Sequence, residues 1–359
     1  MIAPWRSIEA LRIALLLQIG MAIFTAWIIA STARAMRVTH PWLVGALYLF
    51  SPIVIINTVS VATEAMYVLF TAAAASLLVR GVYRSSNGAI VASGLVCGLA
   101  ALVRPIGVVL CVVGLAAVVW SAISRRHLRR VLLWVVAAWL VLFAWSIRNG
   151  VVGGFWGPSR TIVSFPSSSL GTQYLVRGIE PMKTSAYDTR GFRAGVADIL
   201  EGVAHRPAAA TRTLLAGSAR TLLGPGEWAL RRALLGATGT RGSGDEGITF
   251  RIAVGDDGLL MTREATRQQI EGRSALCWVL LTWSIAATLV VYVYALRGLV
   301  RCRRARSRLA LVWIACAVAL TLSSASFLSN SRFRLPVLPF VLLLGAQGTN
   351  CVAQRRVPE

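Results

Sequence analysis

The stretch that decides the fold is PIVIINTVSVATEAMYVLFTAAAASLLVR, residues 52–80. It contains Glu64, the only acidic residue between Arg12 and Arg148. An acidic side chain beside long apolar segments costs free energy unless it is paired or faces a water-filled cavity. Glu64 is therefore a candidate functional residue. The apolar segments on either side of it determine on which side of a membrane it lies.

Apolar segments long enough to cross a membrane recur along the whole chain. The 359 residues are 56% hydrophobic and only 14% charged, which is typical of a multi-pass membrane protein and not of a soluble domain. Since a membrane-spanning helix needs about 20 apolar residues, the sequence predicts an all-α polytopic protein with about nine transmembrane helices. We expect these spans near residues 9–33, 41–59, 64–80, 88–103, 105–123, 131–147, 275–296, 309–328 and 335–352.

The loops between the predicted spans fall into two alternating sets that differ in charge. One set contains sixteen basic residues and a single acid, Glu359. Basic residues in short loops stay on the cytoplasmic side of a membrane, so this set is predicted to be cytoplasmic. Membrane insertion and contact with anionic lipid account for the net charge of +23, and we expect no nucleic-acid partner. The sixteen are Arg34, Arg37, Arg80, Arg84, Arg125, Arg126, Arg129, Arg130, Arg297, Arg301, Arg303, Arg304, Arg306, Arg308, Arg355 and Arg356.

The chain divides by polarity into three regions. Residues 1–147 and 274–359 contain the predicted spans, and the second of these regions ends in a cytoplasmic tail. Residues 148–273 form one long polar segment, which the topology places outside the cytoplasm. Within it, residues 211–224 and 227–236 are predicted to form short amphipathic helices along the membrane interface. We therefore expect a multi-pass protein of the plasma or inner membrane with a large extracytoplasmic loop.

Glu64 has a structural interpretation as well as a functional one. Pro52 lies late in the predicted span 41–59 and is expected to kink or end it, because proline removes a backbone hydrogen bond and clashes with the preceding turn. Thr63 is expected to cap the next helix. Glu64 then lies in the first turn of that helix, where an acid interacts favourably with the helix dipole.

Arg104 lies in a very short outer connection, LVRPIGVVL, residues 102–110. Pro105 suits the first turn of the following helix. The positive-inside rule gives no reason for an arginine on the outer side, so the structural alternative is a side chain that anchors the helix at the interface. The preceding segment, residues 88–101, is rich in Gly and Ala and predicts close helix packing.

The predicted topology places one acid and four arginines at the outer membrane level. Guanidinium groups match phosphate oxygens bidentately and stay charged when partly desolvated, so the arginines are candidate ligands for a lipid phosphate. The acid is a candidate structural carboxylate that fixes the arginines or supports a divalent metal, the one cofactor that the residues suggest. These residues are Glu64, Arg104, Arg148, Arg332 and Arg334.

The motifs PIVIINTVSVATE, GLAALVRPIG, WSIRNG and SNSRFRLPVLPF together resemble the integral-membrane C-type (GT-C) glycosyltransferases. The resemblance is to the protein mannosyltransferase and aminoarabinose transferase branch, and it covers about residues 9–150 and 275–350. It implies a cell-envelope enzyme that moves a sugar from a polyprenyl-phosphate donor to a glycan, lipid or protein acceptor outside the cytoplasm. The four arginines would then bind the donor phosphate.

The sequence departs from that family at its start. GT-C enzymes begin with a further span and an outer loop whose acid is the catalytic base, whereas Glu9 is the only acid before Glu64 here. A general base must reach the acceptor hydroxyl, so no catalytic residue is assigned. Either the sequence starts downstream of that loop or the protein is a catalytically incomplete relative. The alternative functions are a lipid flippase or transporter, which inverted repeats would favour, and a non-catalytic membrane accessory protein.

Overall fold

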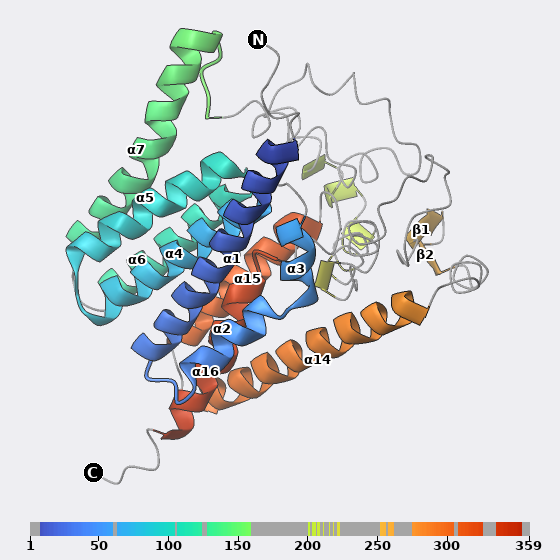
Figure 1. The fold of residues 1–359 in the computed structure, drawn as a ribbon. Coiled ribbons are helices and arrows are strands. Elements are labelled where there is room, and N and C mark those ends of the chain that lie inside the picture. Colours follow the sequence, from blue (N-terminus) through green and yellow to red (C-terminus); the bar gives the residue numbers. More distant parts are fainter. Residues whose placement is uncertain are drawn as a thin grey trace. The chain divides into compact units, whose positions relative to one another are not determined.

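The structure is a computed structural model that describes most of the apolar part of the chain. The described residues are 8–59, 63–104, 106–123, 128–158, scattered positions between 200 and 222, 252–255, 258–261, 275–304, 308–325 and 335–353. Within them the chain is helical apart from one antiparallel pair of strands (Figure 1). β1 (Ile252–Gly255) pairs with β2 (Gly258–Met261) so that Ile252 lies opposite Met261.

The described helices follow the predicted spans closely. Four of them are long and apolar enough to cross a membrane, and several shorter apolar helices accompany them. The prediction of a helical polytopic membrane protein is therefore confirmed. The helices are α1 (Ile8–Ala35), α2 (Pro41–Leu49), α3 (Pro52–Val59), α4 (Glu64–Tyr83), α5 (Asn87–Val103), α6 (Gly107–Ile123), α7 (Leu128–Gly153), α14 (Ala275–Arg304), α15 (Arg308–Ala325) and α16 (Leu338–Ala353).

The predicted span 41–59 is two helices in the structure, which confirms the interruption expected at Pro52. Helix α2 ends at Leu49 and α3 begins at Pro52. Proline has no backbone N–H, so it is well tolerated at the first position of a helix and poorly tolerated inside one. The Ser51 carbonyl accepts the first hydrogen bonds of α3, from the Val54 N–H at 2.9 Å and the Ile55 N–H at 3.2 Å.

The chain forms two compact units. The first unit comprises residues 1–141, 283–319 and 335–359, and the second comprises residues 142–282 and 320–334. In the first unit the large side chains of Trp134, Trp313 and Phe340 are fully buried, and nearly every described side chain from residue 335 to residue 348 is buried as well. Helix α16 is therefore the most enclosed apolar element that the structure describes in this unit.

Small residues allow close helix packing in the first unit, as the composition of residues 88–101 predicts. A Cβ atom added at Gly94 of α5 would lie 2.6 Å from the Trp134 carbonyl oxygen of α7. One added at Gly98 would lie 2.6 Å from the Ala138 carbonyl oxygen. Neither distance is compatible with a side chain, so these glycines set how closely α5 and α7 approach.

The polar segment 148–273 is described only in part. Residues 211, 215, 218, 221 and 222 are helical and fall within 211–224, where the amphipathic character of the helix stays a prediction. The second predicted amphipathic helix, over 227–236, lies outside the described residues.

Candidate functional site

Arg104 is fixed by the tight connection between α5 and α6. Its φ of −143° and ψ of 134° are extended, as expected for a residue that precedes a proline, and this ends α5 at Val103. The Arg104 N–H donates to the Ala100 carbonyl at 3.0 Å, and the Arg104 carbonyl accepts from the Gly107 N–H at 2.8 Å. A Cβ at Gly107 would lie 2.6 Å from the backbone of Ala101, so glycine is needed where α6 begins. The sequence RPIG thus holds the Arg104 backbone in one conformation.

Glu64 begins α4, as predicted, and lies in its first turn. Thr63 occupies the N-cap position, but its hydroxyl makes no capping hydrogen bond. Instead the Thr63 Oγ1 accepts from the Arg104 Nε at 3.4 Å. The sequence predicted the position of Thr63 correctly, but its φ of −74° and ψ of −5° are helical and not the extended angles of a capping residue, so its hydroxyl does not cap the helix.

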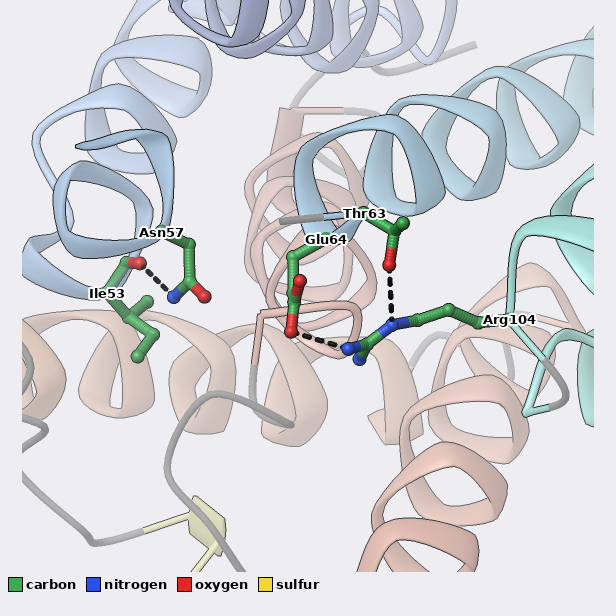
Figure 2. A network of polar contacts seen from close by, with 5 residues as sticks. All are labelled: Ile53, Asn57, Thr63, Glu64 and Arg104. Carbon is green, nitrogen blue, oxygen red and sulfur yellow. Dashed lines mark hydrogen bonds and ion pairs between the residues drawn. The ribbon is translucent and has the colours of Figure 1, made fainter. Parts of the chain in front are cut away.

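The Arg104 guanidinium and the Glu64 carboxylate form an ion pair (Figure 2). The Arg104 Nη2 lies 2.5 Å from the Glu64 Oε1, and the two side chains are only 16% and 3% exposed. Charge-assisted hydrogen bonds of this kind are short and strong, and burial makes each partner dependent on the other. The sequence placed these two residues on the same side of the membrane, and the structure brings them together.

Two further buried polar residues, Asn57 and Tyr67, lie on the helices next to the pair in the sequence and were missed by the sequence analysis as candidate site residues. Asn57 of α3 lies across from Glu64 in Figure 2, is 6% exposed and donates from Nδ2 to the Ile53 carbonyl at 2.7 Å. Tyr67, one helical turn after Glu64, is fully buried. The spacing of three residues from Glu64 was the available signal for Tyr67, because residues three apart share a helix face.

Arg148 lies near the end of α7 in the second unit, and its described contacts are within that unit. Its guanidinium carbon lies 5.0 Å from the centre of the Trp145 ring, and its Nη1 donates to the Asn149 Oδ1 at 3.2 Å. Asn149 in turn donates to the carbonyl oxygens of Gly157 and Pro158. These contacts hold Arg148 against Trp145 near the end of α7.

The remaining predicted site residues, Arg332 and Arg334, lie outside the described residues. The structure brings Arg104 to Glu64, and the convergence of Arg148, Arg332 and Arg334 on that pair stays a prediction. Among the described residues, no group of three or more His, Cys, Asp or Glu side chains is arranged to hold a metal ion. Within the described residues, the structure brings together the buried Glu64 carboxylate and the partly buried Arg104 guanidinium at the end of apolar helices.

These features define a multi-pass membrane protein with a buried ion pair at one end of its helices. The comparison with protein families gives a more specific assignment. A family model described as GPI transamidase subunit PIG-U matches residues 3–182, half of the 359-residue chain. The chain belongs to the PIG-U family. Searches of the curated proteins and of the solved structures each found no significant match.

The family assignment corrects the predicted function. The resemblance to GT-C glycosyltransferases is wrong, and with it the predicted transfer of a sugar from a polyprenyl-phosphate donor, the sugar-lipid partner and the cell-envelope enzyme class. The prediction of a multi-pass membrane location is confirmed, but the PIG-U family belongs to the endoplasmic reticulum (ER) membrane, not to the plasma membrane.

The incorrect resemblance has a physical explanation. Each of its four motifs depends on only one or two charged residues, and in three of them an arginine stands within two residues of a proline or glycine. Such residues mark the ends of apolar helices in any polytopic protein. Arginine is also frequent here, since the chain contains 37 basic residues and only one lysine. The family model instead matches a continuous segment from residue 3 to residue 182.

Proposed function

We propose that this protein is a non-catalytic membrane subunit of a complex that attaches glycosylphosphatidylinositol (GPI) anchors to proteins. The observation that carries the proposal is the match of residues 3–182 to the PIG-U family model. The partners would be the other transamidase subunits and the protein precursors that receive the anchor.

The described helices suit a subunit embedded in a larger membrane assembly. Helix α7 exposes a stripe of apolar side chains at helical spacing, formed by Leu132, Val136, Trp139, Leu140 and Phe143. Helix α14 exposes a second stripe, formed by Leu289, Val293, Leu296 and Val300. Such faces accommodate lipid chains and the helices of other subunits.

The proposal includes a topology for the ER membrane. The basic short loops face the cytosol, and residues 148–273 face the lumen between the membrane regions 1–147 and 274–359. Arg104, Arg148, Arg332 and Arg334 then lie on the luminal side. There they are candidate ligands for the phosphate of a GPI glycolipid, because guanidinium groups bind phosphate bidentately.

The function can be tested by deletion and complementation in the protein's own cells. Deletion is expected to lower the surface display of a GPI-anchored reporter, and the tagged wild-type chain is expected to restore it. Flow cytometry measures the display, and phosphatidylinositol-specific phospholipase C should release the restored reporter. A reporter anchored by its own transmembrane helix serves as the control and should not change.

The same tagged chain tests the proposed partners. After solubilisation in mild detergent, the other transamidase subunits are expected to co-purify with it. Two results together would contradict the proposal. Reporter display would stay normal after deletion, and no transamidase subunit would co-purify with a chain that is well expressed and inserted in the membrane.

A further inference from the structure

The end of the first unit away from the candidate site carries a cluster of arginines, which we call the basic end. Arg80, in the last turn of α4, donates from Nη2 to the Ser31 hydroxyl of α1 at 3.2 Å. Arg130, in the first turn of α7, donates from Nη2 to the Ser85 carbonyl of the α4–α5 turn at 3.1 Å. These contacts bring the ends of α1, α4 and α7 together. The basic end comprises Arg34, Arg37, Arg80, Arg84, Arg129 and Arg130.

Among the described residues of the first unit, no acid lies at the basic end. The sequence of this unit contains three acids, Glu9, Glu64 and Glu359. Glu9 and Glu64 lie in the first turns of α1 and α4, whereas the basic end is formed by the last turns of the same helices. Glu359 is the last residue of the sequence and lies outside the described residues. The charge of the cluster is therefore not balanced by the carboxylates that the structure places in this unit.

Arg130 is the most enclosed member of the cluster. It is only 9% exposed, and its described partners are the neutral oxygens of Ser85 and Asn87, the latter 3.4 Å from Nε. Burying a charge without an opposite charge is costly, and neutral hydrogen-bond acceptors compensate for only part of that cost. An external anion beside Arg130 would supply the missing compensation.

The helices around Arg130 add to the positive potential. Helix α5 begins at Asn87, next to the Arg130 guanidinium, and Arg129 and Arg130 both lie in the first turn of α7. The N-terminal end of a helix carries a partial positive charge, so arginines at two such ends are unfavourable unless an anion is present. Arg84 and Arg129 are exposed and can reach an anion from the solvent side.

We propose that the basic end binds the phosphate of an anionic lipid headgroup, with Arg130 as its central ligand and Arg84 and Arg129 around it. The guanidinium fork matches phosphate oxygens bidentately. A lipid is the expected source, because these residues lie at the ends of membrane-spanning helices, where headgroups are located. The proposal is independent of GPI attachment, since it depends on the charges and burial at the basic end.

The full-length protein in phosphatidylcholine nanodiscs provides the test. Phosphatidic acid with a fluorescent acyl chain is the probe, because its headgroup is a phosphate alone, and native mass spectrometry counts the bound lipid. Arg130→Gln is expected to weaken phosphatidic acid binding about tenfold, which corresponds to about 1.4 kcal/mol. Arg130→Lys should give an intermediate affinity, because lysine keeps the charge and loses the fork. Arg12→Gln, an exposed arginine near the start of α1, is the matched control and should bind as the wild type does.

A second variant keeps the proposal testable if Arg130→Gln does not fold. Arg84→Gln/Arg129→Gln changes two exposed residues and should weaken binding several-fold while leaving the protein monodisperse. Wild-type affinity in both variants would overturn the site. Inorganic phosphate is then tested as a competitor of the probe in pure phosphatidylcholine nanodiscs. If it displaces the probe completely and binds as tightly, the site recognises free phosphate and not a lipid headgroup.

Discussion

Each end of the first unit holds an arginine with little exposure to solvent, Arg104 partly buried and Arg130 buried, and the two ends compensate the charge differently. At the candidate site, Arg104 lies 2.5 Å from the Glu64 carboxylate and 3.4 Å from the Thr63 hydroxyl. At the basic end, the described partners of Arg130 are the neutral oxygens of Ser85 and Asn87. Both arginines connect helices that are distant in the sequence, but only one of them has its counter-charge within the fold.

This difference predicts that Arg104 contributes more to the stability of the fold than Arg130 does. An arginine whose counter-charge is in the protein stabilises the fold only while both partners are present. An arginine whose partners are neutral contributes less to folding, and its positive charge can still attract an external anion. Stability should therefore respond mainly to changes at the Glu64–Arg104 pair, and lipid dependence mainly to changes at Arg130.

The largest expected effect is at Glu64. Glu64→Gln removes the buried carboxylate that pairs with the partly buried Arg104 guanidinium, so the free energy of unfolding should fall by about 3 kcal/mol. Thermal unfolding of the purified full-length protein in detergent measures the loss. Glu9→Gln, which changes an exposed acid in the first turn of α1, is the matched control and should change stability little. A Glu64→Gln protein as stable as the Glu9→Gln protein would show that the pair is dispensable.

The double variant Glu64→Leu/Arg104→Leu sharpens this comparison. Removing both charges should recover most of the stability lost in Glu64→Gln, because replacing a buried pair by apolar residues is often close to neutral. The double-mutant cycle isolates the interaction between the two residues. Losses that simply add in the double variant would indicate that Glu64 and Arg104 act separately.

The next largest effect is the response to anionic lipid. A ligand at a hundred times its dissociation constant stabilises the folded state by about 2.7 kcal/mol, so phosphatidic acid should raise wild-type stability by about that amount. Arg130→Gln should lose this gain, and Glu64→Leu/Arg104→Leu should keep it. Thermal unfolding with and without the lipid measures both. An equal gain in all three proteins would remove the distinction between the two ends.

Much of the helical arrangement could be predicted from the sequence, because a membrane-spanning helix needs a long apolar segment. The break of span 41–59 at Pro52 and the end of α5 before Pro105 follow from the geometry of proline and of the residue before it. The close approach of α5 and α7 follows from glycines at positions 94 and 98. These features are local, and one sequence is sufficient to read them.

The candidate site was less predictable, because it depends on contacts between distant segments. The sequence placed Glu64 and Arg104 on one side of the membrane, but their contact depends on how the α5–α6 connection meets the start of α4. Arg130 was assigned only to a cytoplasmic loop, since burial cannot be read from a run of arginines. The function was predicted wrongly because charged residues at helix ends are common to unrelated membrane proteins.

A smaller effect is expected at Arg130 in the absence of anionic lipid. Arg130→Met removes hydrogen bonds to two neutral oxygens and also removes a cation from the start of two helices. These contributions have opposite signs, so the free energy of unfolding should change by about 1 kcal/mol or less. Thermal unfolding in lipid-free detergent measures it, with Arg129→Met as the exposed control. A loss as large as that of Glu64→Gln would show that Arg130 is also a structural residue.

The smallest expected effect is at Thr63, which tests whether the carboxylate alone positions Arg104. The Thr63 hydroxyl makes no capping bond, and its hydrogen bond from the Arg104 Nε is long, at 3.4 Å. Thr63→Ala should therefore lower the free energy of unfolding by only about 0.5 kcal/mol, the lower limit for a net hydrogen bond. Thr63→Ser, which keeps the hydroxyl, should match the wild type in the same thermal unfolding measurement. If Thr63→Ala instead destabilised the protein as much as Glu64→Gln does, the hydroxyl would share the positioning of Arg104, and the simple contrast between a carboxylate-paired and a neutrally paired arginine would fail.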